Sequence, residues 1–270
     1  MQLVSRCGIA RGLLGATLAL VTACSSPVDW TPTRALVQPA SGAGALTADG
    51  SLVPDTIAAL AARIGQLPGA VCPGSLRLAS ARTALIGVWW APRPDSGARL
   101  LAARSSDGGR SWSAPTPVDT VDQSVTGCRR EPPAITADAA TGYVHVTYAL
   151  LAPEGPGLFF SHSMDGGLTF HAPVPIMYGD RLGGTSVASD GDLVVVGFED
   201  PNSATPRVGL AISHTMGHIF ENRVVPVSDD NGAATDPMTA IRGSRVAVAW
   251  RQHATASGPA ALMVRVGTVR

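Results

Sequence analysis

The sequence predicts an all-β fold, a β-propeller of four-stranded antiparallel blades, from a strand pattern that recurs along the chain. Four strand-like runs rich in β-branched residues each end on an aromatic residue, and they recur about every 50 residues. A shorter candidate strand precedes each run and another follows it. In the first three units a Gly-rich turn then leads to a fourth strand, and this period and strand count are typical of a propeller blade. The four aromatic residues are Trp90, Tyr148, Phe198 and Trp250.

The fourth unit stops at Arg270 after its third strand. A closed propeller can take its missing strand from the other end of the chain, and "TRALVQPA" near residue 35 is the candidate. That pairing would give a ring of four blades. A fifth, irregular blade and an open ring completed by dimerisation are the alternatives, and the oligomeric state stays open.

One short N-terminal helix is predicted within "PDTIAALAARIGQLPG", residues 54–69. Pro54 and Asp55 stand at its start, apolar residues follow at helical spacing, and Pro68 and Gly69 end it. This helix would cover one end of the ring.

The N-terminus has the pattern of an export signal. Arg6 and Arg11 precede an apolar run, residues 13–23, that is too short to span a membrane. The run ends in "VTAC", which resembles the lipobox of bacterial lipoproteins. The resemblance implies that residues 1–23 are a signal peptide and that Cys24 carries the lipid. The protein would then be exported and anchored to the bacterial cell membrane, the outer membrane in a Gram-negative cell. A plain secretory signal with a cut further downstream is the alternative.

The segment that follows, residues 24–53, is rich in Ser, Pro, Gly and Ala. This composition predicts a flexible tether that could also supply the closing strand, and it leaves residues 54–270 for the propeller domain. The 20 basic residues are all arginine, and they balance 20 acidic residues to a net charge of 0. A near-neutral chain argues against nucleic acid as a partner, because phosphate binding relies on a basic face.

The turns between the third and fourth strands share a motif. "SSDGGRSW" and "SMDGGLTF" resemble the Asp-box of sialidase-like propellers, and "SHTMGHIF" is a degenerate third copy without the aspartate. The resemblance covers residues 72–270 and implies the fold, with the motif fixing turns rather than acting in catalysis. The motif residues are Ser105, Asp107, Gly109 and Trp112 in the first copy and Ser163, Asp165, Gly167 and Phe170 in the second.

Two cysteines remain after the leader, Cys72 and Cys128, each just before the first strand of a successive unit. Neighbouring blades place these positions side by side, and an exported compartment permits a disulfide. The sequence therefore predicts a bridge that joins the first two blades.

The family resemblance places a ligand face at the inner strands and at the loops that lead into them. Converging arginines there would favour an anionic ligand, because guanidinium groups match carboxylates with two hydrogen bonds. The alternative is that these arginines form ion pairs with acids of the same loops. The ligand-binding candidates are Arg77, Arg129, Arg130, Glu131, Tyr178, Asp180, Arg181 and Asp236.

A sialidase of this family uses an arginine triad, an acid/base aspartate and a tyrosine nucleophile activated by a glutamate. Of the tyrosines Tyr143, Tyr148 and Tyr178, only Tyr178 lies in such a loop, and no glutamate is near it in sequence. No catalytic residue is therefore assigned. The favoured prediction is a non-catalytic binding module for glycan or an envelope protein. An exo-acting, sialidase-like glycoside hydrolase and a structural envelope assembly factor are the alternatives.

No cofactor or metal site is predicted. The acidic stretch "SDDNGAATD" lacks the regular ligand spacing of a calcium loop. His214 and His218 fall in a turn, where their spacing does not align two imidazoles as a helix would.

Overall fold

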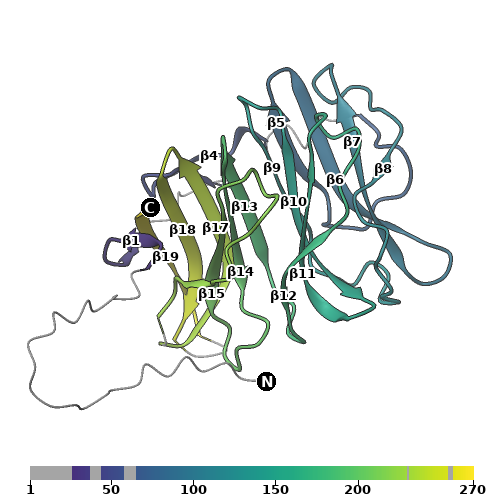
Figure 1. The fold of residues 1–270 in the computed structure, drawn as a ribbon. Coiled ribbons are helices and arrows are strands. Elements are labelled where there is room, and N and C mark those ends of the chain that lie inside the picture. Colours follow the sequence, from purple (N-terminus) through teal and green to yellow (C-terminus); the bar gives the residue numbers. More distant parts are fainter. Residues whose placement is uncertain (1–25, 37–43, 58–64, 230, 255–257) are drawn as a thin grey trace, which may run out of the picture.

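The computed structural model describes residues 26–36, 44–57, 65–229, 231–254 and 258–270. Apart from helical residues 56–57, at the start of the predicted helix, its regular structure is β, with strands arranged mainly in four antiparallel sheets (Figure 1). The leader, Cys24 and the body of the predicted helix lie outside the described residues. In the part that is described, no helix has the length and apolar character needed to cross a membrane.

Each sequence unit forms one sheet whose strands follow one another in the chain. Sheet 1 contains β5 (Arg77–Ala81), β6 (Ala84–Pro92), β7 (Ala98–Ser105) and β8 (Thr116–Pro117). Sheet 2 contains β9 (Ala134–Ala137), β10 (Val144–Ala152), β11 (Gly155–Ser163) and β12 (Val174–Tyr178). Sheet 3 contains β13 (Thr185–Asp190), β14 (Leu193–Glu199), β15 (Val208–Ser213) and β16 (Val225–Pro226). The predicted four-stranded meanders are confirmed.

Sheet 4 is completed from the N-terminal segment. It contains β17 (Ala233–Arg242), β18 (Arg245–His253) and β19 (Ala260–Val269), joined by β1 (Val28–Trp30) and β2 (Arg34–Ala35). Val28 lies opposite Val269, and Arg34 lies opposite Val264, so both short strands run antiparallel to β19. The pairing expected near residue 35 therefore begins upstream, at β1, and this part of the predicted tether is structured.

The four sheets form an open, propeller-like arc. Their inner strands β5, β9, β13 and β17 lie side by side in chain order. Among the described residues, β17 and β5 make at most slight contact, so the first and last sheets do not close a ring.

Successive sheets bury apolar side chains between them, as alternation along the strands requires. Ile86, Val88 and Trp90 on β6 pack toward Val146 and Tyr148 on β10. Each middle strand is covered on both faces, which explains why the sequence runs that end on aromatic residues are almost continuously apolar.

The two end faces of the arc are covered by the chain itself. On sheet 1, Trp89 and Trp112 pack against Leu67 and Val71 from the segment before β5. Sheet 4 is covered by a hairpin of β3 (Gly44–Leu46) and β4 (Leu52–Pro54). At its tip, Gly50 lies so close to sheet 4 that a Cβ would come within 2.6 Å of Val266 Cγ2. These segments pack on the end faces and cover them in part without a further blade.

The Asp-box turns are held by their own side chains. Asp107 Oδ1 accepts hydrogen bonds from the N–H groups of Arg110 (3.0 Å) and Ser111 (2.9 Å), and its Oδ2 accepts one from the Ser111 hydroxyl (2.6 Å). The hydroxyl of Ser111 is the main cause of a lowered Asp107 pKa, because it stabilises the ionised form. Ser105 Oγ accepts the Gly109 N–H at 2.8 Å. Asp107 is thus a turn fastener.

The second copy repeats this geometry around Asp165. Burial opposes ionisation of Asp165, but hydrogen bonds from Thr169 and Ser163 outweigh it and lower its pKa to about 2. In the degenerate third copy, Thr215 Oγ1 takes the place of the carboxylate and accepts the Ile219 N–H at 2.9 Å. A hydroxyl is therefore sufficient to keep the turn.

Cys72 and Cys128 form the predicted disulfide, with a Cα–Cα distance of 5.2 Å. The bridge joins the loops that lead into β5 and β9, the inner strands of the first two sheets.

Candidate functional site

We call the end of the arc where the inner strands begin the front face, and the opposite end the Asp-box face. The sequence predicts that arginines converge on the front face. Arg130 instead lies in the interior, with only 7% of its side chain exposed. Its Nη1 forms an ion pair with Asp122 Oδ2 at 2.6 Å, and its guanidinium lies 4.2 Å from the centre of the Trp90 ring. Arg130 is therefore an internal structural residue and not available to a ligand.

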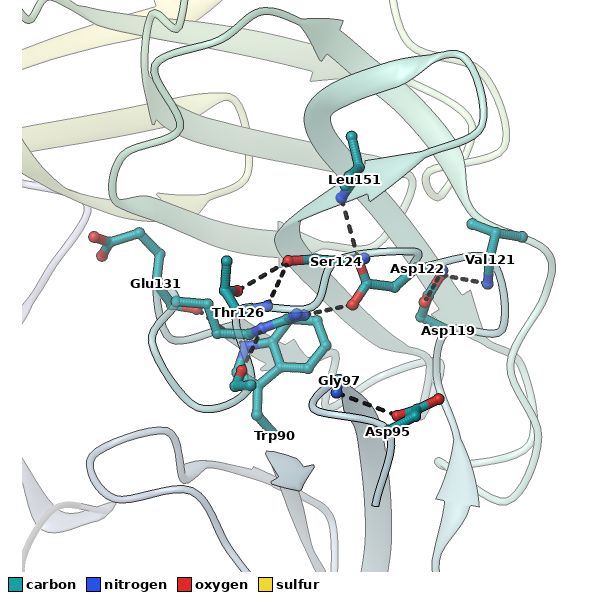
Figure 2. A network of polar contacts seen from close by, with 12 residues as sticks. Trp90, Asp95, Gly97, Asp119, Val121, Asp122, Ser124, Thr126, Glu131 and Leu151 are labelled. Atoms are coloured by element: carbon teal, nitrogen blue, oxygen red, sulfur yellow. Dashed lines mark hydrogen bonds and ion pairs between the residues drawn. The ribbon is translucent and has the colours of Figure 1, made fainter. Parts of the chain in front are cut away.

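Figure 2 shows the network around this ion pair. Asp122 Oδ1 accepts the N–H groups of Ser124 and Leu151, both at 3.2 Å, and Trp90 Nε1 donates to the Glu131 carbonyl at 3.0 Å. These bonds tie the loop between sheets 1 and 2 to both sheets.

A cavity of about 270 Å³ borders the same network, and its charged lining includes Arg93, Asp119 and Asp122. Burial raises the pKa of Asp119, although its carboxylate accepts the N–H groups of Val121 and Asp122. Arg93 pairs with Asp95. The charged groups there are mostly engaged with one another or with the backbone, as in a structural loop.

Tyr148 lies beside this network, fully buried, and its hydroxyl has no hydrogen-bond partner among the described residues. Burial, with the negative charges of Asp119 and Asp122, raises its pKa well above the usual value. A tyrosine nucleophile needs its ionised form to be favoured, so Tyr148 has the opposite environment.

Two other predicted arginines are used by their own loops. Arg77 donates to the carbonyls of Gly74 (2.9 Å) and Leu76 (2.8 Å), and Arg181 donates to those of Ser203 (3.2 Å) and Ala204 (2.5 Å). Irregular loops leave carbonyls without a strand partner, and these guanidinium groups satisfy them. The predicted convergence of arginines does not form.

The remaining candidates are separate from one another. Arg129, Glu131 and Asp180 are exposed in loops. Tyr178 was predicted in a loop that leads into an inner strand, and this placement is wrong: it ends the outer strand β12, where its ring meets the Phe159 ring edge-on at 5.7 Å.

Asp236, one of the predicted ligand-binding residues, belongs to a polar cluster on the front face. It lies at a bulge in β17, where the register shifts between Thr235 and Met238, and its φ is 53°. A positive φ is uncommon outside glycine, so this backbone is held by its surroundings. Its N–H donates to Glu199 Oε1 at 3.0 Å, and Arg251 Nε lies 3.5 Å from its Oδ2. We call Glu199, Asp236 and Arg251 the carboxylate centre.

Glu199 is the partly buried member of this centre. Burial raises its pKa, the N–H groups of Asp236 and Gly184 oppose the rise, and the negative charges of Asp236 and Glu131 add to it. Gly183 packs so closely that a Cβ there would come within 2.3 Å of Glu199 Oε2. The carboxyl group is thus fixed in place by the loop that leads into sheet 3.

The other two members face solvent. The side chains of Asp236 and Arg251 are 66% and 49% exposed. The cavity that Glu199 lines with Leu182 and Pro201 has a volume of only about 10 Å³, about the space of one water. A ligand can reach the centre from outside, and the cavity that the described residues form beside Glu199 is too small for a sugar ring.

Sequence reasoning named Asp236 and Glu131 but missed Glu199 and Arg251. A signal for them exists in the repeat. The residue after the core aromatic is alanine in the first two units, Ala91 and Ala149, but is charged in the last two. Charged residues at one repeat position in neighbouring units lie near each other on one face.

A histidine cluster lies toward the Asp-box face, between sheets 2 and 3. The His162 ring lies 4.4 Å from that of His171 and 4.5 Å from that of His218, centre to centre, and His145 stacks on Phe160. Among the described residues, no group of three His, Cys, Asp or Glu side chains could hold a metal ion. Burial lowers the pKa of His145 and of His162 to about 4, and neighbouring histidines contribute.

We therefore expect stability to fall as the pH is lowered from about 6.5 to about 4. In the unfolded chain these histidines bind protons near pH 6.5, but in the folded chain they bind them only near pH 4. Between these two pH values the unfolded chain binds more protons, so acid favours unfolding. The loss from His145 alone should be on the order of 3 kcal/mol at pH 4. Urea unfolding at half-unit pH steps measures it.

His145→Phe is the matched control, because in the part of the chain that is described neither ring nitrogen of His145 has a hydrogen-bond partner, and a phenyl ring has a similar shape. The variant should show a shallower pH dependence. An unchanged slope would exclude His145 as its source.

Comparison with known proteins gives similarity in fold only. No family model matches the chain, and no curated protein matches it. A solved structure titled Hadza microbial sialidase Hz136 is 18% identical with a TM-score of 0.49, over 70% of this chain and 43% of that one. The NanB sialidase from Streptococcus pneumoniae is 10% identical with a TM-score of 0.47, over 75% and 51%. A glycosyl hydrolase from Bacteroides ovatus is 14% identical with a TM-score of 0.44, over 81% and 73%. The match with this chain thus spans about half of the length of each of the two sialidases, 43% of one and 51% of the other.

Proposed function

We propose that this chain is a carbohydrate-binding module that binds a glycan on its front face through the carboxylate centre. The observation that carries the proposal is the arrangement of Glu199, Asp236 and Arg251, two carboxylates and a guanidinium held by the backbone at an open surface. Carboxylates accept hydrogen bonds from sugar hydroxyls and guanidinium groups donate to them, so the three groups can bind neighbouring hydroxyls.

The open setting favours binding over hydrolysis. A glycosidase must enclose the scissile bond between two carboxyl groups, one of them protonated. The small volume beside Glu199 does not provide that enclosure. The fold in this proposal is an incomplete propeller of the sialidase-like superfamily, with Asp-boxes as turn fasteners.

Hydrolysis is the second candidate, favoured by one observation. The raised pKa of Glu199 is the shift that a general acid needs, and Asp236 lies beside it. In that case the sugar would bind with its leaving-group oxygen toward Glu199.

A glycan array followed by chromogenic glycosides separates the two candidates. We expect wild-type protein to bind a defined set of glycans and to release no chromophore. Turnover that is lost in Glu199→Gln would assign hydrolysis instead. An array without any bound glycan, together with no release of chromophore, would contradict both candidates and favour an envelope protein as ligand or a structural role.

The cellular setting in this proposal is a lipid anchor at Cys24 in the bacterial envelope. Labelling cells with a palmitate analogue tests it, because Cys24→Ser should abolish incorporation. Incorporation that persists in this variant would contradict the anchor.

A further inference from the structure

A groove of about 660 Å³ lies between the covering hairpin and sheet 4, on the Asp-box face. Leu46, Thr47 and Val53 line it from the hairpin, and Arg242 and Arg245 line it from the turn between β17 and β18. The hairpin strand β3 contacts β17. The volume lies within the usual range for small-molecule sites.

Arg242 and Arg245 are directly opposite each other in the β17–β18 ladder. Residues opposite each other in an antiparallel pair project from the same face of the sheet, and like charges there repel. Both arginines are exposed, and neither guanidinium group forms an ion pair or hydrogen bond with another described residue. Two guanidinium groups thus lie together, and the described part of the chain supplies a partner to neither.

The nearby acids are engaged elsewhere. Asp49 lines the groove, but its carboxylate accepts hydrogen bonds from the Thr47 hydroxyl and the Ser51 N–H. Asp190 Oδ2 accepts the Gly243 N–H at 2.6 Å, at the turn between the arginines. Neither carboxylate pairs with Arg242 or Arg245, so an added anion would face both guanidinium groups.

The rest of the lining suits the remainder of such a ligand. Leu46, Val53 and Ala240 give an apolar wall, and the hydroxyls of Thr47 and Ser51 lie on the hairpin side. Val53 is 42% exposed, so its side chain is free for further contact.

We infer that this groove binds an anionic ligand, whose carboxylate or phosphate lies between Arg242 and Arg245 and whose apolar part packs on Leu46 and Val53. Two guanidinium groups match the oxygens of either anion with paired hydrogen bonds. The site is separate from the carboxylate centre, which lies toward the other end of β17.

Titration of the mature chain with benzoate and with phenyl phosphate, followed by amide NMR shifts, tests this inference. At least one probe should shift the amides of the hairpin and of residues 240–245, and the better probe identifies the preferred anion. Neutral benzyl alcohol should bind at least tenfold more weakly. Arg242→Gln and Arg245→Gln should each weaken the better probe about tenfold, the effect of losing one charge-assisted contact.

Arg99→Gln is the matched control, because Arg99 is another exposed arginine on a strand, and it should bind as wild type. Thermal unfolding without ligand is a second readout: Arg245→Gln should be at least as stable as wild type, because it relieves repulsion. Absence of shifts with both probes, or equal binding by the arginine variants, would overturn the inference.

Discussion

Replacing Asp122 by alanine should lower the free energy of unfolding by about 3–5 kcal/mol, the usual cost of leaving a buried partner charge alone. Asp122 and Arg130 are 4% and 7% exposed, and their closest atoms are 2.6 Å apart. The substitution also leaves the N–H groups of Ser124 and Leu151 without their acceptor. Guanidinium unfolding followed by Trp fluorescence measures the loss.

Two comparisons make this prediction specific. Asp95→Ala breaks an exposed ion pair with Arg93 on the same side of the fold and should cost less than about 1 kcal/mol. The double variant Asp122→Leu with Arg130→Met removes both charges and should be more stable than Asp122→Ala, because no buried charge is left unpaired. A loss from Asp122→Ala no larger than that from Asp95→Ala would show that the buried pair does not matter.

Removing the Cys72–Cys128 disulfide should cost about 4 kcal/mol, from the loop entropy that a cross-link over such a separation removes from the unfolded chain. The two cysteines are 56 residues apart, and Cys72 is 1% exposed. Urea unfolding of Cys72→Ala, Cys128→Ala and the double variant measures the cost.

The three variants should lose nearly equal stability, because either substitution alone opens the same bridge. Reduced wild-type protein should unfold at the same urea concentration as the three variants. A loss below about 1 kcal/mol in the double variant would contradict the assignment of the bridge as a structural link between the first two sheets.

The sequence predicted the strand arrangement well, because the repeat records local structure several times over. The aromatic residues from Trp90 to Trp250 each lie within the second strand of a sheet, although each strand continues past its aromatic residue, and the Asp-box turns lie between the third and fourth strands. The disulfide followed from the same repeat, since equivalent positions in adjacent units lie side by side.

Ring closure could not be predicted in this way. Whether the first and last sheets meet depends on long-range contacts that no local pattern records. Here the segment before β5 and the β3–β4 hairpin cover the two end faces, and neither segment has a repeat signature.

The candidate site was predicted only in part, because composition does not show what a charged side chain bonds to. Arg77 and Arg181 bond to backbone carbonyls, and Arg130 is buried on Trp90. Asp236 was predicted as part of a polar loop, although it lies in β17, whereas Glu199 ends an apolar strand and its local sequence gives no sign of a site. The bulge that brings Asp236 to Glu199 is a tertiary feature, with a backbone angle that aspartate seldom adopts.

The most direct test of the proposed function is calorimetry with the tightest glycan from the array. Wild-type protein should bind, and Glu199→Gln and Arg251→Gln should each bind at least tenfold more weakly. Glu154→Gln is the control, an exposed glutamate between β10 and β11 that should bind as wild type. Undiminished binding by Glu199→Gln and Arg251→Gln would show that the glycan binds elsewhere and would contradict the carboxylate centre as the functional site.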